Sequence, residues 1–291
     1  LARKAARAGM GLNIDAEEMD RLGLSMEVIA AVLADDALAG WDGFGVVVQA
    51  YGRRAGDMLE ALYTLATRQD RRIMVRLVKG AYWDTEIKHA QVEGLEDFPV
   101  FTRKPASDVS YIAHARRLLG MTDRIYPQFA THNAHTVAAV LEMAEGVDRS
   151  RFEFQRLHGM GEALHRIVMA DHGTRCRIYA PVGAHRDLLA YLVRRLLENG
   201  ANSSFVNRIA DADVPPDVVA ACPFAALDGA PATYEPALKT GPDLFQPERP
   251  NSVGFDLTDA VTLARIDTAR VCPEELAVTP MLAGPVAGGD R

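Results

Sequence analysis

The chain has 291 residues, of which 48% are hydrophobic and 24% are charged, so it can bury one large core or two modest ones. Its net charge of −7 comes from charges of both signs without basic runs, which excludes the charge pattern of a nucleic-acid-binding protein. No apolar run approaches the length of a membrane-spanning helix and no signal peptide is visible, so we expect a cytoplasmic protein.

The three cysteines, Cys176, Cys222 and Cys272, are odd in number and far apart. This spacing predicts reduced thiols and favours neither a disulfide framework nor a zinc site. The first residue is Leu1, and the last segment, 278–291, carries no signal that closes a helix. We therefore expect the sequence to be a piece of a longer chain.

Short apolar runs alternate with helical patterns over the first 200 residues. The apolar runs predict strands at 9–15, 43–51, the start of 73–83, 125–129, 152–157 and 176–180. Helical spacing of apolar residues predicts helices at 1–8, about 26–33, 58–66, 109–119, 135–145, between 157 and 176, and at 188–199. We expect the segment 84–104 to be a long connection.

Strict alternation of strand and helix predicts right-handed βαβ units and a parallel sheet. The sheet could be an open doubly wound one or most of an eightfold barrel. A barrel gathers polar groups from many strand ends, whereas a doubly wound sheet concentrates them at one switch point. Six different strand ends carry such groups here, namely Asp15, Gln49, Lys79, His132, Gln155 and Tyr179. We therefore predict an α/β fold, a partial TIM-like (βα)8 barrel that lacks its first two strands.

The composition changes after the last predicted helix. Residues 1–210 form the predicted barrel, and the proline-rich stretch 211–250 has weak periodicity, which is typical of a linker. We interpret residues 251–291 as the start of a further domain.

Arg76 lies in the middle of the central strand, which we expect to be buried on both faces. A buried guanidinium costs several kcal/mol unless an anionic group meets it. Either a structural carboxylate or an anionic or electron-rich ligand must therefore lie at its tip.

The last helix carries Tyr191, Arg194, Arg195 and Glu198 in one narrow stripe between apolar neighbours. The stripe could be solvated, with Arg194 paired to Glu198. It could also form a twin-arginine clamp for a carboxylate, with Asp15 orienting one arginine from across the barrel mouth.

Other polar residues leave more than one role open. His132 could be a metal ligand, a base, a donor to a cofactor or a structural histidine, although no accompanying metal-ligand spacing is present. Lys79 could form a Schiff base as in barrel aldolases. The run 102–104 could bind phosphates or be plain surface charge.

Four motifs point to one family. They are Arg-Leu-Val-Lys-Gly-Ala-Tyr-Trp-Asp (76–84), Gln-Phe-Ala-Thr-His-Asn-Ala-His (128–135), Phe-Gln-Arg-Leu-His-Gly-Met-Gly (154–161) and Tyr-Leu-Val-Arg-Arg-Leu-Leu-Glu-Asn-Gly-Ala-Asn-Ser-Ser-Phe-Val-Asn (191–207). Over about residues 9–210, the chain resembles the proline dehydrogenase domain of bifunctional proline utilisation A flavoenzymes. The segment from Arg249 onward resembles the linker into the aldehyde dehydrogenase half of those enzymes, an L-glutamate gamma-semialdehyde dehydrogenase.

The resemblance implies a distorted (βα)8 barrel that binds FAD noncovalently and oxidises L-proline to Δ1-pyrroline-5-carboxylate in proline catabolism to glutamate. It further implies that electrons pass to a quinone, that the full-length protein associates peripherally with the membrane, and that it is a homo-oligomer. We expect no nucleic-acid-binding module and no metal in this chain.

The resemblance also implies roles for individual residues. Arg194 and Arg195 would grip the proline carboxylate, Asp15 would orient that clamp, and Arg76 would lie near the flavin N5. The residues implied to pack on the proline ring are Tyr82, Leu157 and Tyr179. The remaining residues implied to line the cofactor are Gln49, Val78, Gly80, Ala81, Trp83, Thr102, Arg103, Lys104, Thr131, His132, Asn133, Gln155 and Glu198.

Two other hypotheses stay open on the sequence alone. One is an aldolase that uses Lys79 as its Schiff-base lysine. The other is a partial barrel that binds partners without any cofactor.

Overall fold

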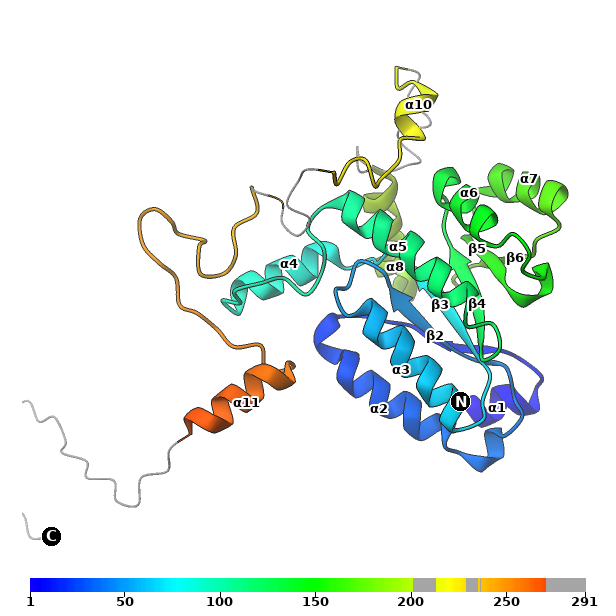
Figure 1. Ribbon diagram of the computed structural model, residues 1–291, viewed down its shortest axis with the longest axis horizontal. Helices are drawn as coiled ribbons and strands as arrows, with labels where there is room; N and C mark the ends of the chain where they lie inside the picture. Colours follow the sequence, from blue (N-terminus) through cyan, green and yellow to red (C-terminus); the bar gives the residue numbers. More distant parts are fainter. Residues whose placement is uncertain (201–212, 229–234, 236, 271–291) are drawn as a thin grey trace, which may run out of the picture. The chain divides into compact units, whose positions relative to one another are not determined.

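The computed structural model describes residues 1–200, 213–228, 235 and 237–270, and at 197–200 it describes the backbone alone (Figure 1). The chain divides into two compact units, Leu1–Gly254 and Phe255–Arg291. In the second unit the described part is mainly the helix α11 (Ala260–Ala269), which begins where the Asp259 carboxylate accepts a hydrogen bond from the Thr262 N–H.

The first unit is built on one sheet of parallel strands that follow chain order. The strands are β1 (Leu12–Ile14), β2 (Phe44–Gln49), β3 (Ile73–Val78), β4 (Ile125–Ala130), β5 (Glu153–Leu157) and β6 (Cys176–Tyr179). Each strand pairs in parallel with the next, and the sheet curls as a half-barrel (Figure 1). The predicted alternating α/β fold, a partial (βα)8 barrel, is confirmed.

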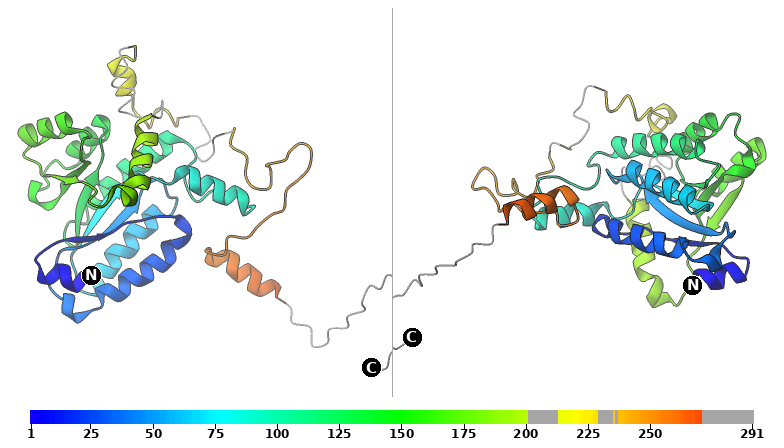
Figure 2. Two further views of the ribbon diagram at one scale, coloured as in Figure 1. Left: turned by 180° about the vertical axis from the view of Figure 1, so that it is seen from behind. Right: turned by 60° about the horizontal axis from the view of Figure 1, so that its bottom comes forward.

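Helices precede, connect and follow the strands. They are α1 (Ala2–Arg7), η1 (Met19–Arg21), α2 (Leu22–Leu33), η2 (Asp36–Leu38), α3 (Ala55–Arg68), α4 (Trp83–Val92), α5 (Lys104–Leu119), α6 (Ala134–Met143), η3 (Arg149–Arg151), α7 (Glu162–His172), α8 (His185–Gly200) and α10 (Pro216–Val219). Several of the helices cover the outer face of the sheet (Figures 1 and 2). None of the described helices is long and apolar enough to cross a membrane.

The prediction that 84–104 is only a connection was wrong, because α4 occupies its first half. The buried side of this helix includes Glu86 and Gln91 beside Ile87 and Ala90, so a search for apolar spacing does not find it. Helix α5 also begins earlier than predicted, at Lys104, where Pro105 suits the first helical turn.

The main core lies between the sheet and its outer helices. Every residue of β2 is buried, and Leu59 and Leu62 of α3 pack into the same apolar cluster. Three phenylalanine rings, Phe129, Phe152 and Phe154, contact one another with centroids about 6 Å apart. This apolar packing lies on the outer side of the sheet, between the strands and the helices.

The central strand β3 is buried on one face only, which corrects the prediction of burial on both faces. Ile73, Val75 and Leu77 are completely buried toward the helices, whereas Arg76 and Val78 are partly exposed on the concave face. Alternate residues of a strand point to opposite faces, so Arg76 and Val78 lie on the face opposite to the buried residues of β3.

Part of the predicted linker is folded against α4. The Gln91 side chain donates to the Lys239 carbonyl at 2.7 Å, and the Gly254 N–H donates to the Gly94 carbonyl at 2.8 Å. Gly94 has a φ of +69°, and a side chain there would lie 2.6 Å from the Ser252 carbonyl oxygen, so only glycine permits this approach.

His132 joins the ends of β4 and β5. The Leu157 N–H donates to His132 Nε2 at 2.9 Å, so the neutral ring carries its proton on Nδ1. Burial lowers the pKa of His132 to about 4, and the neighbouring His165, Arg195 and Arg156 act in the same direction. His132 is therefore neutral in the folded protein at pH 7.

Lowering the pH from 6.5 to 5 should reduce the free energy of unfolding by about 1.6 kcal/mol through His132. In this range the unfolded residue, with an ordinary pKa of 6.5, takes up a proton that the folded residue does not bind until about pH 4. Urea unfolding at the two pH values measures the difference. The variant His132→Asn should show a smaller difference in the free energy of unfolding, because it lacks the contribution of His132.

The matched control is His158→Asn, because His158 is exposed at the surface. It should keep the wild-type pH dependence. A His132→Asn protein with the full wild-type dependence would contradict the assignment.

Candidate functional site

The concave face of the sheet collects several of the predicted site residues. In the strand register Gln49 is paired with Val78, Leu157 is paired with Tyr179, and Arg76 is paired with the interior residue Gln128. Register partners in neighbouring strands point to the same face. The structure therefore brings these residues to one side of the sheet.

Arg76 is ion-paired with Asp15, with Nη1 3.1 Å from Oδ1. The role that we expect for Asp15 in orienting the arginines of α8 stays a prediction. The strand register explains the pair, because Asp15 continues β1 one residue beyond the Ile14–Val46 match and Val47 is paired with Arg76. The two side chains thus lie in one row across three strands.

Aromatic rings link Arg76 to helix α8. The Arg76 guanidinium carbon lies 5.2 Å from the centroid of the Tyr179 ring. The ring centroids of Tyr179 and Tyr191 are 6.4 Å apart. The guanidinium of Arg195 lies 5.0 Å from the Tyr191 ring, and that of Arg194 lies 5.4 Å from the Tyr82 ring. We call Arg76, Tyr82, Tyr179, Tyr191, Arg194 and Arg195 the arginine–tyrosine cluster.

Tyr191 was not among the predicted site residues. Its signal was present in the sequence, since it shares the polar stripe of α8 with Arg194 and Arg195. What was missing was the pairing with Tyr179, which depends on how α8 packs across the end of β6.

Lys79 lies apart from this cluster. It follows β3 with the orientation of Leu77, toward the helices, and forms an ion pair with Asp108 of α5. Lys104 meets the same carboxylate at 3.1 Å. Burial is the main reason that the pKa of Lys79 is lowered, while Asp108 opposes that shift.

Two cavities border the predicted residues. One of about 610 Å³ is lined by Ala81, Tyr82 and Arg194, together with Glu18 and apolar residues of α8. A smaller one, of about 290 Å³, is lined by Lys104 and Asn133 at the starts of α5 and α6 and by part of 218–226.

The run 102–104 contacts the later part of the first unit. The Thr102 hydroxyl accepts a hydrogen bond from the Glu235 N–H at 2.8 Å, and Arg103 donates to the Ala226 carbonyl at 3.2 Å. Of the three predicted phosphate contacts, the structure places Lys104 against a cavity.

The other predicted residues have structural partners too. Gln49 donates to the Glu17 carbonyl at 2.7 Å, and Trp83 donates to the Phe101 carbonyl at 2.9 Å. Gly80, with a φ of +133°, passes directly over the Tyr51 ring, where a side chain would clash. The Glu198 side chain lies outside the described residues.

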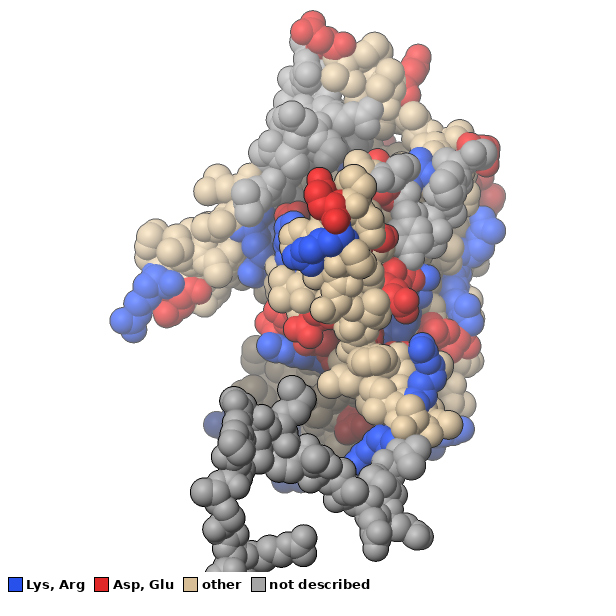
Figure 3. Space-filling model, turned by 90° about the vertical axis from the view of Figure 1, so that its left-hand side faces the viewer, with Lys and Arg blue, Asp and Glu red and all other residues tan. Residues whose placement is uncertain are grey.

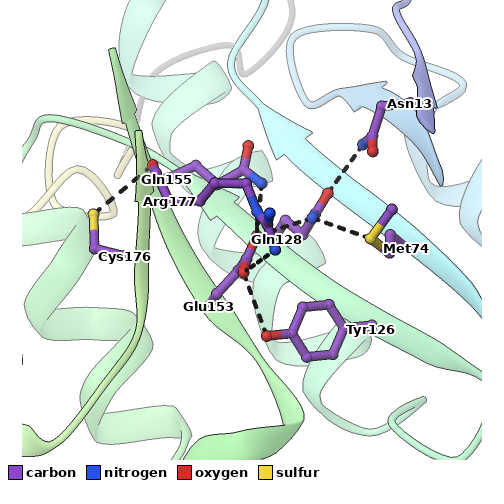
Figure 4. A network of polar contacts seen from close by, with 8 residues as sticks. All are labelled: Asn13, Met74, Tyr126, Gln128, Glu153, Gln155, Cys176 and Arg177. Carbon is purple, nitrogen blue, oxygen red and sulfur yellow. Dashed lines mark hydrogen bonds and ion pairs between the residues drawn. The ribbon is translucent and has the colours of Figure 1, made fainter. Parts of the chain in front are cut away.

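Asn133 and Thr131 organise the start of α6. The Asn133 side chain caps the helix by accepting a hydrogen bond from the Thr136 N–H at 3.1 Å, and the Thr131 hydroxyl accepts one from the Asn133 N–H. Gln155 is 3% exposed and takes part in a network around Glu153 (Figure 4).

Charges of both signs are interspersed on the face of the molecule shown in Figure 3. Within the part of the chain that the structure describes, no three His, Cys, Asp or Glu residues are grouped as metal ligands.

Comparison with known proteins gives the family. The sequence profile of the proline dehydrogenase family matches residues 1–208. Bifunctional protein PutA of Escherichia coli (strain K12) is 49% identical over 98% of this chain and 23% of its own length, and that of Rhizobium meliloti is 49% identical over 100% and 24%. The chain therefore spans about a quarter of the length of these relatives.

A solved structure agrees with the sequence comparisons. A crystal structure of a bifunctional proline utilization A (PutA) protein superposes with a TM-score of 0.90 at 52% identity, covering 98% of this chain and 29% of that one. The profile match over most of the chain and these similarities lead to one conclusion: the chain belongs to the proline dehydrogenase family.

Proposed function

We propose that this chain carries an FAD-dependent activity that oxidises L-proline to Δ1-pyrroline-5-carboxylate. The family and the names of its relatives support an enzyme of this class. The observation that carries the proposal is the arginine–tyrosine cluster, in which guanidinium groups and aromatic rings alternate at the carboxyl end of the sheet.

The cluster suits an amino acid carboxylate. Arg76 has Asp15 as its counterion, whereas Arg194 of α8 stacks on Tyr82 and its buried Nε forms no hydrogen bond with any described residue. A guanidinium in such surroundings favours an anionic partner, and its planar fork matches a carboxylate. We assign the grip on the substrate carboxylate to Arg194 and Arg195.

The apolar ring of proline needs a different surface. Tyr82, Tyr179 and Leu157 border the arginines, and the two tyrosine rings already stack against guanidinium groups. Flat rings and a leucine side chain bury the methylene groups of a small cyclic substrate while the arginines hold its charge.

The residues present fit FAD. Arg76 Nε is buried and forms no hydrogen bond within the described part of the chain, so an acceptor atom of a ligand ring would pair with it. When bound, FAD supplies the acceptor for the two electrons and the hydrogen removed from the substrate carbon. Arg76, oriented by Asp15, would then place a positive charge beside the ring.

Other concave-face and cavity residues would hold the cofactor in this proposal. Gln49, Val78 and Gln155 face the same side as Arg76, and Lys104 and Asn133 line the smaller cavity, where a cation and two helix N-termini suit phosphate groups. His132, neutral at pH 7, would orient the end of β5 and would not act as a charged group.

We extend the proposal to the cellular context by analogy with the relatives. The electrons would pass to a quinone at a membrane surface, with the protein cytoplasmic and associated peripherally, and the product would feed glutamate formation. A homo-oligomeric whole protein belongs to the same analogy.

Arg194→Lys should raise the KM for L-proline roughly tenfold to hundredfold, because an ammonium group cannot form the paired hydrogen bonds of a guanidinium. FAD content, measured from the visible spectrum of the whole protein, should stay at the wild-type level.

The matched control is Arg186→Lys on the same helix, since the Arg186 side chain is 90% exposed. It should leave KM unchanged. An unchanged KM in Arg194→Lys would refute the assignment of Arg194 to the carboxylate.

Lys79→Met separates this function from a Schiff-base aldolase. Because Lys79 pairs with Asp108 on the helix side of the sheet, the variant should keep proline oxidation within about threefold, provided that it folds. Borohydride treatment with a carbonyl substrate should label neither protein. Covalent trapping that disappears in Lys79→Met would support the aldolase.

A further inference from the structure

Glu153 is a buried carboxylate on the concave face of β5, only 3% exposed. Its Oε1 accepts hydrogen bonds from Gln128 Nε2 at 2.9 Å and Gln155 Nε2 at 2.8 Å (Figure 4). Arg177 meets both oxygens, with Nε 2.7 Å from Oε1 and Nη2 3.0 Å from Oε2, and the Tyr126 hydroxyl lies 3.4 Å from Oε2. This one side chain therefore binds groups from β4, β5 and β6.

The carboxylate determines how the neighbouring amides are turned. An ionised carboxylate only accepts hydrogen bonds, so each amide must direct its NH2 group toward Glu153 and its oxygen away. Gln128 agrees with this rule, because its oxygen in turn accepts from Asn13 Nδ2 at 3.0 Å. The direction of the network is thus set from Asn13 through Gln128 to Glu153.

The same rule applies to Gln155, with a different outcome. Its NH2 group is held by Glu153, and its oxygen is turned away from the carboxylate (Figure 4). No described residue donates a hydrogen bond to that oxygen. Gln155 lies two residues before Leu157, on the strand face that also carries Arg76 and Tyr179.

We propose that Glu153 is a positioning residue, which locks the Gln155 amide so that its oxygen, and not its NH2 group, faces the flavin. The inference rests on the proposed function, in which Gln155 lines FAD. A flavin ring carries an N–H group, so an acceptor at this place pairs with it, whereas a donor would leave two N–H groups facing each other.

A simpler role for Glu153 would be to neutralise Arg177. The two roles differ in a measurable way. If Glu153 acts through Gln155, its replacement alters the flavin environment only while Gln155 is present. If Glu153 only neutralises the charge of Arg177, its replacement changes FAD binding by the same amount whether or not Gln155 is present.

The test uses the whole protein and measures the FAD dissociation constant and the flavin reduction potential, with no reference to turnover. Glu153→Gln keeps the shape but adds a donor, so the Gln155 amide loses its fixed direction. We expect FAD to bind about tenfold more weakly and the potential to shift. In the Gln155→Ala background the same change should weaken binding less than twofold.

Glu142→Gln on α6 is the matched control, since it makes the same replacement at an exposed position, and it should change neither quantity. If Glu153→Gln does not fold, Glu153→Asp is compared in the two backgrounds in the same way. Its effect on FAD binding should also disappear without Gln155.

Wild-type FAD affinity in Glu153→Gln, or a loss that persists in full in the Gln155→Ala background, would overturn the positioning role. If the proposed function itself is wrong, the result differs, because the wild-type protein would then bind no FAD at all.

Discussion

The site depends on one constraint, which is that successive side chains along each parallel strand point to opposite faces of the sheet. The outer face of the sheet has to be apolar because helices cover it, as Ile73, Val75 and Leu77 of β3 show. The residues between them face the concave side, where polar groups from several strands meet. Arg76 reaches Asp15 only because both lie in one row of the register. A shift of one residue in any strand would bury these charges against the apolar helices.

Two ion pairs balance charge on the concave face. Arg177 and Glu153 form a bidentate pair, and Arg76 pairs with Asp15. Both pairs are completed within the protein. Arg194 of α8 instead lies against the ring of Tyr82, and its buried Nε forms no hydrogen bond with any described residue. This difference is the physical reason why we propose Arg194 for the substrate carboxylate and Glu153 for holding other side chains in place.

Much of the fold could be predicted from the sequence, because short apolar runs and helical spacing are local signals. All six predicted strands form, in the expected parallel sheet. Helix α4 was missed because its buried side includes Glu86 and Gln91. The exposed face of β3 was missed because the apolar composition of the strand does not show which of its faces a helix covers. The Asp15 partner and the place of Tyr191 depend on register and helix packing, which no local pattern contains. The roles assigned to the site residues remain predictions.

The central claim is that the concave face brings L-proline and FAD together. The most direct measurement is the visible absorption spectrum of the purified whole protein before and after L-proline is added without oxygen. We predict oxidised-flavin bands that are present at the start and bleach when L-proline is added. A protein that takes up no FAD, or whose flavin bands are unchanged by L-proline, would contradict the account.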